Sequence, residues 1–418
     1  MKEDGVKMNE NWKNRITLFL FGQAISLLGS SIVTYAITFF IILNSESGIM
    51  LTMVVICAFL PTLLLSPFGG VWADRFDRKK LIIGADAFIA LVTVYMFVMF
   101  YTGTESLFLL CVLITCRAFG AGIHTPCVNA VIPQIVPKDK LEKVNGIISI
   151  IQTAILLLGP ILGGLVLSIS SITYIFLIDI ITAAIAILIL ILFIRIPVHE
   201  KARIKQENAY IRDMKEGFAY IKSKKYLGKF FVFYAVAYFL CPPVVFLAPL
   251  QVTRSFGSVV WHLTLTQVAL AFGMVIGGVW IATVGGFKNR IHTVVFSSCV
   301  IGVCTIILGG IPMIFPIFWI YLVFLSMVGA GMSLYSAPVT IMLQEKVDSD
   351  FQGRVFGVLG MISSSMMPLG IIILGPIADR VAIEWLLIVT GTLAVIQSII
   401  LFSNKDVVNA GKPKENAK

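Results

Sequence analysis

The chain has 418 residues, of which 58% are hydrophobic and only 13% charged, and its mean hydropathy is +0.96. Soluble globular proteins carry about 25% charged residues, so this inventory excludes an aqueous globular protein. The net charge of +10 does not indicate nucleic-acid binding, because the basic residues are dispersed between long apolar runs.

Twelve apolar runs follow one another, each close to the ~20 residues that a helix needs to cross about 30 Å of hydrocarbon. A transmembrane β-barrel is excluded, because its strands are about 10 residues long and alternate in polarity. We therefore predict an all-α membrane protein with twelve transmembrane helices. Their expected ranges are 16–43, 49–72, 81–101, 106–131, 144–168, 171–194, 229–253, 261–284, 290–311, 316–340, 353–377 and 384–402.

The basic residues set the expected topology. All of the 32 Lys and Arg residues except Arg117, Arg254 and Arg380 lie in the N-terminal tail, in every second loop or at the span ends beside it, or in the C-terminal tail. This positive-inside pattern predicts that both termini are cytoplasmic, most simply in a bacterial cell membrane. The polar start, 1–15, precedes the first span without a small-residue cleavage site, so we expect no removable signal peptide. The seven cysteines lie in apolar segments without metal-ligand spacing, and we interpret them as packing residues, with no metal site.

The most specific local pattern is the loop GVWADRFDRKK, residues 70–80, between the second and third spans. Gly70 would let two helices approach closely. Asp74 can accept hydrogen bonds from the free N–H groups of a helix N-terminus, and Arg75 and Arg78 can bridge to carboxylates. The alternative is that these basic residues only anchor the topology.

Arg117, Asp179 and Asp86 are charged residues deep inside spans. Helical rise places Arg117 roughly 16 Å below the outer edge of the fourth span and Asp179 roughly 12 Å below that of the sixth, while Asp86 lies roughly 9 Å above the cytoplasmic face. A guanidinium at that depth costs at least about 2.5 kcal/mol on insertion, and more without a partner. We predict that Arg117 pairs with Asp179 in one state, and that protonation of Asp179 releases it. Asp86 is the competing proton carrier, and purely structural ion pairs are the alternative.

The fifth span contains Gly159-Pro160-x-x-Gly163-Gly164. Pro160 removes a helical hydrogen bond, and the glycines permit a bend and close packing, which we expect against the eighth or eleventh span. These two effects together would make the fifth span a bending element.

The longest polar stretch, 195–228, separates six spans from six. Within it Ile211, Met214, Phe218 and Ile221 recur at helical spacing, which predicts an amphipathic helix on the membrane face. The expected organisation is an N-terminal six-helix bundle with its tail (1–194), this cytoplasmic linker, a C-terminal six-helix bundle (229–402) and a cytoplasmic tail (403–418).

The two halves are related in sequence. GGVW ends both the second span (69–72) and the eighth (277–280), and L-x6-G-x-G recurs at 113–122 and 322–331. The offset stays between 208 and 211 residues along the matched positions. Two parallel six-helix repeats are the sequence pattern of major-facilitator transporters, which hold substrate between the halves.

With these motifs, the chain resembles the drug-exporting branch of the major facilitator superfamily, and within it the macrolide-efflux group. The resemblance implies a cytoplasmic gating motif that engages the start of the eleventh span near Gly353-Arg354. That motif comprises Gly70, Asp74, Arg75, Arg78 and Lys79, with Asp77 where many members have glycine. It further implies an intramembrane arginine motif at Arg117 and an antiporter motif at Gly159, Pro160, Gly163 and Gly164, with Ile155 in place of a glycine.

By the same resemblance, the first, fourth, seventh and tenth spans line a substrate cavity. Their polar and aromatic candidates are Gln23, Ser30, Tyr35, Asn129, Tyr234, Tyr238 and Tyr335. Aromatic side chains offer adaptable apolar contact, which suits large amphipathic cargo.

The sequence therefore predicts a secondary exporter of amphipathic, macrolide-like antibiotics that exchanges drug for protons by alternating access and confers antibiotic resistance. No nucleophile–base pair, P-loop or metal cluster appears, so we expect no enzyme activity and no cofactor beyond the proton gradient. The expected partners are a small amphipathic substrate, protons and membrane lipid, with no nucleic acid, and the functional unit is a monomer. The alternatives are an importer or exporter of a metabolite, siderophore or peptide, or a membrane sensor without transport.

The topology gives a first testable prediction. Cysteines introduced at Lys205 and Lys288 should be cytoplasmic, and those at Ser47 and Gly103 external, because loops rich in Lys and Arg stay inside. An impermeant maleimide applied to intact cells should label only the external pair. Labelling at Lys288 from outside would rule out the twelve-span topology.

Overall fold

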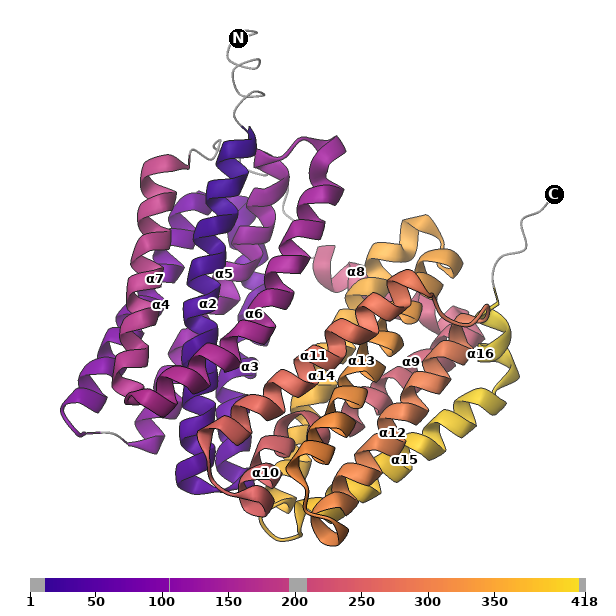
Figure 1. Cartoon of the computed structure of the whole chain (residues 1–418). Helices are drawn as coiled ribbons and strands as arrows, with labels where there is room; N and C mark the ends of the chain where they lie inside the picture. The colour runs from indigo at the N-terminus through magenta and orange to yellow at the C-terminus, as the bar shows by residue number, and fades with distance from the viewer. Residues whose placement is uncertain (1–11, 105, 195–208, 413–418) are drawn as a thin grey trace, which may run out of the picture. The chain divides into compact units, whose positions relative to one another are not determined.

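The computed structural model describes residues 12–104, 106–194 and 209–412, and these are helical with no strand among them (Figure 1). The helices are α2 (Trp12–Ser45), α3 (Gly48–Arg75), α4 (Arg78–Tyr101), α5 (Leu107–Ile135), α6 (Leu141–Ile169), α7 (Ile172–Phe193), α8 (Ala209–Ser223), α9 (Lys225–Leu240), α10 (Ala248–Phe256), α11 (Val260–Thr283), α12 (Arg290–Ile314), α13 (Phe318–Lys346), α14 (Ser349–Ile377), α15 (Ile383–Ser403) and α16 (Lys405–Ala410).

Twelve helical segments of the described chain are long and apolar enough to cross a membrane, as predicted. Several are longer than their apolar runs, because polar residues extend the helices beyond the hydrocarbon. The first span, for example, runs over Trp12–Ser45 instead of 16–43. The all-α membrane fold is therefore confirmed.

The chain divides into two compact units, one of residues 1–41 and 53–204 and the other of residues 42–52 and 205–418. The second unit thus includes the connection from α2 to α3. The linker residues 195–208, where we place a domain boundary, lie outside the described residues.

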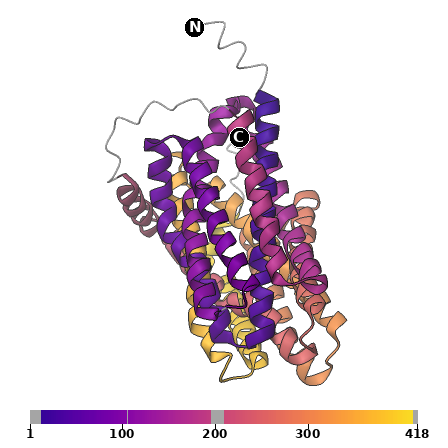
Figure 2. The ribbon, with the colours of Figure 1, turned by 90° about the vertical axis from the view of Figure 1, so that its left-hand side faces the viewer.

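In the first unit, α4 packs against both α5 and α7 (Figure 2). Small residues allow the helices of this unit to approach closely: a Cβ on Gly69 of α3 would lie 2.6 Å from the carbonyl oxygen of Gly122 in α5. The close approach that we expected at Gly70 is therefore made by its neighbour, Gly69. A Cβ on Gly70 meets no described atom within 4 Å, because it points about 100° around the helix from Gly69.

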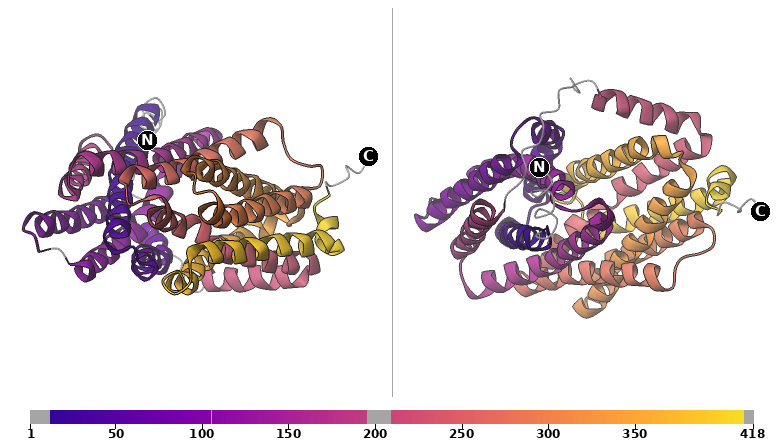
Figure 3. Two further views of the ribbon diagram at one scale, coloured as in Figure 1. Left: turned by 60° about the horizontal axis from the view of Figure 1, so that its bottom comes forward. Right: turned by 90° about the horizontal axis from the view of Figure 1, so that it is seen from above.

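In the second unit, α11 packs along α13, and α12 packs against α13 and α15 (Figure 3). A Cβ on Gly277 of α11 would lie 2.3 Å from the carbonyl oxygen of Ala330 in α13. Gly277 is the repeat counterpart of Gly69, so the same position brings two helices together in each unit. Gly302 and Gly391 make the corresponding approach between α12 and α15.

The linker helix α8 packs against α14 and α9 (Figures 2 and 3). Tyr220 and Ile221 are buried in this contact, and the Tyr220 hydroxyl donates to Asp348 Oδ2 over 2.9 Å. The helix is therefore amphipathic, as predicted, and Ile221 on its apolar face packs against protein. Phe218 is exposed, and the side chain of Ile211 lies outside the described residues.

The seventh span is not one regular α-helix. A π turn at Pro243–Leu247 separates α9 from α10 and begins at the second proline of the pair Pro242-Pro243. Neither proline can donate a helical hydrogen bond, and each ring displaces the preceding turn, so the chain widens locally. Lys225–Phe256 is nevertheless one membrane-spanning segment, as predicted.

Candidate functional site

A buried ion pair lies at the centre of the first unit. Arg117 Nη1 on α5 lies 2.5 Å from Asp179 Oδ2 on α7, and the Asp179 side chain is 1% exposed. Thr93 Oγ1 on α4 lies 2.9 Å from the same Asp179 oxygen and also accepts from Arg117. The charge is thus neutralised inside the protein, as burial in hydrocarbon demands.

The second oxygen of this carboxylate is bound from α2. Ser30 Oγ donates to Asp179 Oδ1 over 2.9 Å. Gly29 makes this contact possible, because a Cβ there would lie 2.0 Å from Thr182 Oγ1 on α7. Ser30, predicted as a substrate contact, is therefore a ligand of the buried carboxylate in this structure.

A cavity of about 170 Å³ borders the ion pair. Arg117 and Ser30 line it, and three threonine hydroxyls, from Thr34, Thr38 and Thr62, lie in its wall. A cavity of this size, lined by hydroxyl groups and a guanidinium among mostly apolar side chains, has room for several water molecules, which could exchange protons with a nearby carboxylate. The ion pair therefore has an adjacent volume in which it could be hydrated.

A second acid, Asp86, is paired with a histidine. His124 Nε2 on α5 lies 3.3 Å from Asp86 Oδ1 on α4, and both side chains are buried. Asp86 Oδ2 has no hydrogen-bond partner among the described residues. The sequence pattern does not indicate this pairing. His124 lies seven residues and thus two turns from Arg117 on the same helix, so α5 carries both acid–base contacts.

The loop 70–80 is organised around Arg78. Its guanidinium donates to the carbonyl oxygens of Ala73 (2.7 Å) and Ala130 (2.6 Å), and it lies 3.0 Å from the Asp74 carboxylate. Arg78 is buried, whereas the Asp74 side chain is 49% exposed. The planar fork of arginine thereby joins the ends of α3 and α5 and leaves much of Asp74 accessible.

Two neighbours of Arg78 form hydrogen bonds with free backbone groups at helix ends. Lys79 Nζ donates to the carbonyl oxygens of Ile194 (2.8 Å) and Ile191 (3.1 Å) at the C-terminus of α7, where a cation is favourable. Asp77 caps α4 by accepting from the backbone N–H groups of Lys79 and Lys80. Asp77 is therefore a helix cap at a position where the resemblance leads one to expect glycine.

Within the second unit, the linker helix α8 contacts the start of α14, which the resemblance makes the partner of this motif. Arg354 Nη2 lies 3.0 Å from Glu216 Oε2 of α8, and a Cβ on Gly217 would lie 3.0 Å from the Arg354 carbonyl oxygen.

Within the first unit, the fifth-span glycines allow close packing against the first span. A Cβ on Gly159 of α6 would lie 2.1 Å from Ser31 Oγ, and one on Gly163 would lie 3.0 Å from the Ile32 carbonyl oxygen, both on α2. The expected packing against the eighth or eleventh span stays a prediction. Helix α6 continues through Pro160 without a break.

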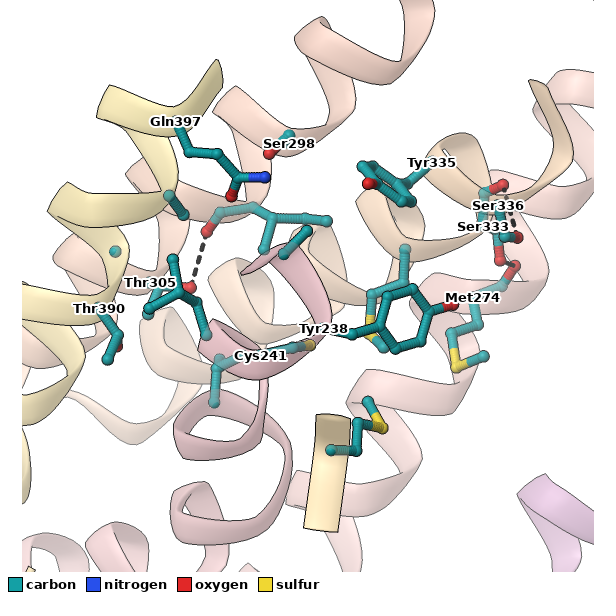
Figure 4. Close-up of a pocket in the computed structure, with 18 residues that line it drawn as sticks. Tyr238, Cys241, Met274, Ser298, Thr305, Ser333, Tyr335, Ser336, Thr390 and Gln397 are labelled. Carbon is teal, nitrogen blue, oxygen red and sulfur yellow. Dashed lines mark hydrogen bonds between the residues drawn. The ribbon is translucent and has the colours of Figure 1, made fainter. Parts of the chain in front are cut away.

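The second unit contains an uncharged cavity of about 160 Å³ (Figure 4). Gln397, Ser298 and Thr305 lie on one side of it, and Tyr335, Tyr238 and Met274 on the other. Cys241 and Val244 also line it, so the π turn of the seventh span forms part of its wall. The Oε1 atom of Gln397 is buried without a hydrogen-bond partner in the described chain, and the residue can therefore accept a hydrogen bond from a ligand.

The remaining predicted cavity residues are distributed over both units. Tyr234 contacts Tyr238 and Tyr335, with ring centroids 4.5 and 6.2 Å away, and so supports the wall of this cavity. In the first unit, Gln23 is buried, Tyr35 packs beside Gly159 and Asn129 is exposed. The structure thus brings the three tyrosines together in one place.

Comparison with known proteins gives consistent matches over most of the chain. A profile described as Major Facilitator Superfamily matches residues 19–371. Macrolide efflux protein A of Streptococcus pyogenes is 32% identical over 392 residues, covering 93% of this chain and 96% of that protein. The staphyloferrin A transporter of Staphylococcus aureus is 22% identical, covering 87% and 90%.

A solved structure extends the similarity to the fold. The nucleoside transporter NupG superposes with a TM-score of 0.66 at 13% identity, covering 93% of this chain and 98% of its own. Because the family profile spans most of the residues and a relative above 30% identity matches nearly end to end, this multi-pass membrane protein belongs to the Major Facilitator Superfamily of transporters.

Proposed function

We propose that the chain is a secondary exporter in the bacterial cell membrane, with both termini cytoplasmic. It moves amphipathic drugs, macrolide-like antibiotics above all, out of the cell in exchange for protons. The observation that carries the cargo class is the 32% identity to a macrolide efflux protein over nearly the whole chain. The observation that carries the coupling is the buried contact between Arg117 and Asp179.

Proton coupling follows from the energetics of that contact. An ionised Asp179 neutralises Arg117, so the pair is stable in a medium of low dielectric constant. Protonation removes the negative charge and leaves the guanidinium inside the protein without a counter-ion, which costs several kcal/mol. A conformation in which Arg117 is better hydrated or meets another acceptor then becomes favoured.

The cavity beside the ion pair supplies room for water during that change. It reaches Arg117 and Ser30, so water in it can solvate the guanidinium when the pair breaks. The Ser30 hydroxyl, which donates to Asp179, adds stabilisation to the ionised carboxylate only. The site therefore has two states whose relative populations depend on one proton.

The uncharged cavity of the second unit fits part of an amphipathic cargo. Its wall combines apolar and aromatic surface with hydroxyl groups and one amide, and it contains no charged side chain. Its volume of about 160 Å³ is below the ~300–1,000 Å³ of sites that enclose a drug-sized ligand. We propose that it receives one apolar portion of the molecule.

A second candidate function is transport of a metabolite, siderophore or peptide by the same fold. The similarity to the staphyloferrin A transporter favours it, because that relative also matches most of the chain. The two candidates differ in the chemistry of the cargo. An anionic cargo would require basic residues in the cavity, and the cavity of the second unit has none.

Drug susceptibility tests the export function. Expression in a bacterium without its own exporters should raise the inhibitory concentration of macrolides severalfold and leave that of a small hydrophilic antibiotic unchanged. Export lowers the internal drug concentration only for molecules that the cavity accepts. Unchanged or increased sensitivity to every macrolide would contradict macrolide export, and growth on a single metabolite would support the second candidate.

The gating motif gives a separate prediction. Asp74→Asn should preserve folding and drug binding, because Arg78 keeps its bonds to Ala73 and Ala130, but it should reduce transport severely. The accessible carboxylate is expected to pair with a cation as well as cap a helix in one conformational state only, and the amide lacks the charge that this pairing needs. Efflux of a preloaded drug from cells, with expression measured alongside, is the readout.

Asp77→Asn is the matched control for this variant. It makes the same chemical change three residues away, and asparagine still caps the start of α4. Transport should therefore stay close to the wild-type rate. Equal rates for Asp74→Asn and the wild type would mean that the loop is only a topology anchor.

Coupling is tested in proteoliposomes. We expect Asp179→Asn to abolish drug-driven proton release while drug binding persists, because an amide cannot carry the proton that Asp179 exchanges. Asp86→Asn is the comparison, since Asp86 is the competing buried acid beside His124. Loss of proton release only in Asp86→Asn would transfer the role to that pair. Normal exchange in both variants would make both contacts structural.

A further inference from the structure

The polar side chains around the cavity of the second unit fall into two groups. In the first group, the hydroxyl already donates to a backbone carbonyl oxygen over 2.7–3.3 Å, and its members are Thr305, Thr390, Ser333 and Ser336. A hydroxyl has a single proton, so these four groups have none left to give to a ligand. Recognition of a polar ligand therefore depends on the second group.

Ser298 on α12 and Tyr335 on α13 belong to this second group. Both side chains line the cavity and are buried, yet neither hydroxyl forms a hydrogen bond with any described residue. The neighbouring Ser297 differs, because its hydroxyl donates to the carbonyl oxygen of Thr293 over 2.7 Å and it does not line the cavity. The hydroxyls of Ser298 and Tyr335 are therefore free to donate and to accept.

Gln397 on α15 adds an acceptor to the second group. Its Nε2 atom donates to the carbonyl oxygen of Phe233 on α9 over 2.5 Å. This bond decides which end of the amide is oxygen, because the flipped amide would set two oxygens against each other. The Oε1 atom is buried and accepts no hydrogen bond within the described chain. A buried oxygen of this kind needs a donor, and Figure 4 shows Gln397 beside Ser298 in the cavity wall.

The wall selects for an uncharged ligand. None of the described residues that line it is acidic or basic. An ammonium group would lose its water there without gaining a counter-ion, and a carboxylate would be repelled by the oxygen of Gln397. A purely apolar group would leave that oxygen without a donor. A neutral hydroxyl satisfies the wall best, because it can donate to Gln397 Oε1 and accept from Ser298.

The volume of the cavity limits the ligand to a single ring. It measures about 160 Å³, and a protein cavity of about 150 Å³ is known to enclose one benzene molecule. Apolar contacts for the ring come from Ile301, Val244 and three methionines, Met274, Met332 and Met367. The ligand that fits is therefore a ring of about six atoms that carries a hydroxyl group.

The resemblance does not predict the polar side of this cavity. It assigns the substrate cavity to the first, fourth, seventh and tenth spans, whereas Ser298 and Gln397 lie on the ninth and the twelfth. On the opposite wall, Tyr238 of the seventh span and Tyr335 of the tenth are residues that we predicted to contact substrate (Figure 4). The cavity therefore extends from two of the predicted tyrosines to two further spans.

We propose that this cavity binds a hydroxyl-bearing ring of the cargo and that Gln397 and Ser298 recognise its hydroxyl group. The hydroxyl donates to Gln397 Oε1 and accepts from Ser298, while Tyr238 and Tyr335 contact the ring from the other side. Such recognition rests on the proposed function only in that the ring is part of the cargo. Gln397 and Ser298 then determine specificity, because they distinguish an alcohol from an ammonium or a hydrocarbon group of equal size.

Binding of small probes to the purified full chain tests this recognition without a proton gradient. Methyl-¹³C labels on the methionines give local signals, because Met274, Met332 and Met367 line the cavity. Cyclohexanol should shift these signals in a saturable way. Methylcyclohexane lacks the hydroxyl and cyclohexylammonium carries a charge, so each should bind about tenfold more weakly, with affinities referred to the free aqueous probe. Equal binding of methylcyclohexane, or tighter binding of the ammonium, would overturn the proposal.

The two adjacent serines provide a matched pair of variants. Ser298→Ala should weaken cyclohexanol binding about three- to tenfold, because it removes one hydrogen bond. Ser297→Ala makes the same change one residue away, outside the cavity, and should leave the affinity unchanged. Gln397→Leu should remove the preference for cyclohexanol over methylcyclohexane, and Ser298→Ala decides the question if Gln397→Leu does not fold. Wild-type affinity in Ser298→Ala, or an equal loss in Ser297→Ala, would contradict recognition of the hydroxyl.

Competition with a macrolide tests whether the ring belongs to the cargo. A macrolide should raise the apparent Kd of cyclohexanol, because both occupy the cavity. If the protein confers macrolide resistance and a macrolide still does not compete, the cavity is no part of the cargo site and the proposal is overturned. If cyclohexanol is recognised as expected but cells gain no resistance, macrolide export is wrong, and recognition of an alcohol by Gln397 and Ser298 is supported.

Discussion

A charge inside hydrocarbon must find its counter-charge within the protein, and in the first unit this requirement determines how four helices meet. Arg117 comes from α5 and Asp179 from α7, while Thr93 on α4 and Ser30 on α2 bind the same carboxylate. Removing any of these partners would leave a polar group buried with fewer bonds, which costs about 1–3 kcal/mol for a neutral group and more for an ion. One carboxylate therefore fixes the packing of the unit and is also its proposed point of proton exchange.

The same physics acts on the ends of the helices, where the backbone groups have no partner in their own helix. At the cytoplasmic loop, Lys79 binds the last carbonyl oxygens of α7 and Asp77 binds the first N–H groups of α4. At the outer end, Asp379 binds the first N–H groups of α3. Each of these charged side chains thus binds specific backbone groups at a helix end. A conformational change can make or break such contacts.

Sequence patterns predict where the spans lie and how deep each charged residue is in the membrane. Apolar runs predict the twelve spans, and helical rise places Arg117 and Asp179 at similar depth, where the structure pairs them. Sequence patterns do not predict contacts that depend on how a helix is oriented about its own axis. The pairing of Asp86 with His124 and the close approach at Gly69 in place of Gly70 both require knowledge of which face of a helix meets its neighbour. The i,i+3/i+4 spacing of apolar residues does not identify the buried face, because these helices are apolar on all sides.

The π turn of the seventh span has a consequence for which changes of sequence the protein tolerates. A π turn adds one residue to a helical turn, so every side chain beyond it is rotated by about 100° relative to an uninterrupted α-helix. Tyr238 and Cys241 on one side of the turn face the cavity, whereas Arg254 on the other side reaches Asp379. Deleting a single residue between Cys241 and Leu247 would preserve a helix and its hydropathy but would turn Arg254 away from its partner. The number of residues in this stretch is therefore fixed, because it sets the direction in which Arg254 points.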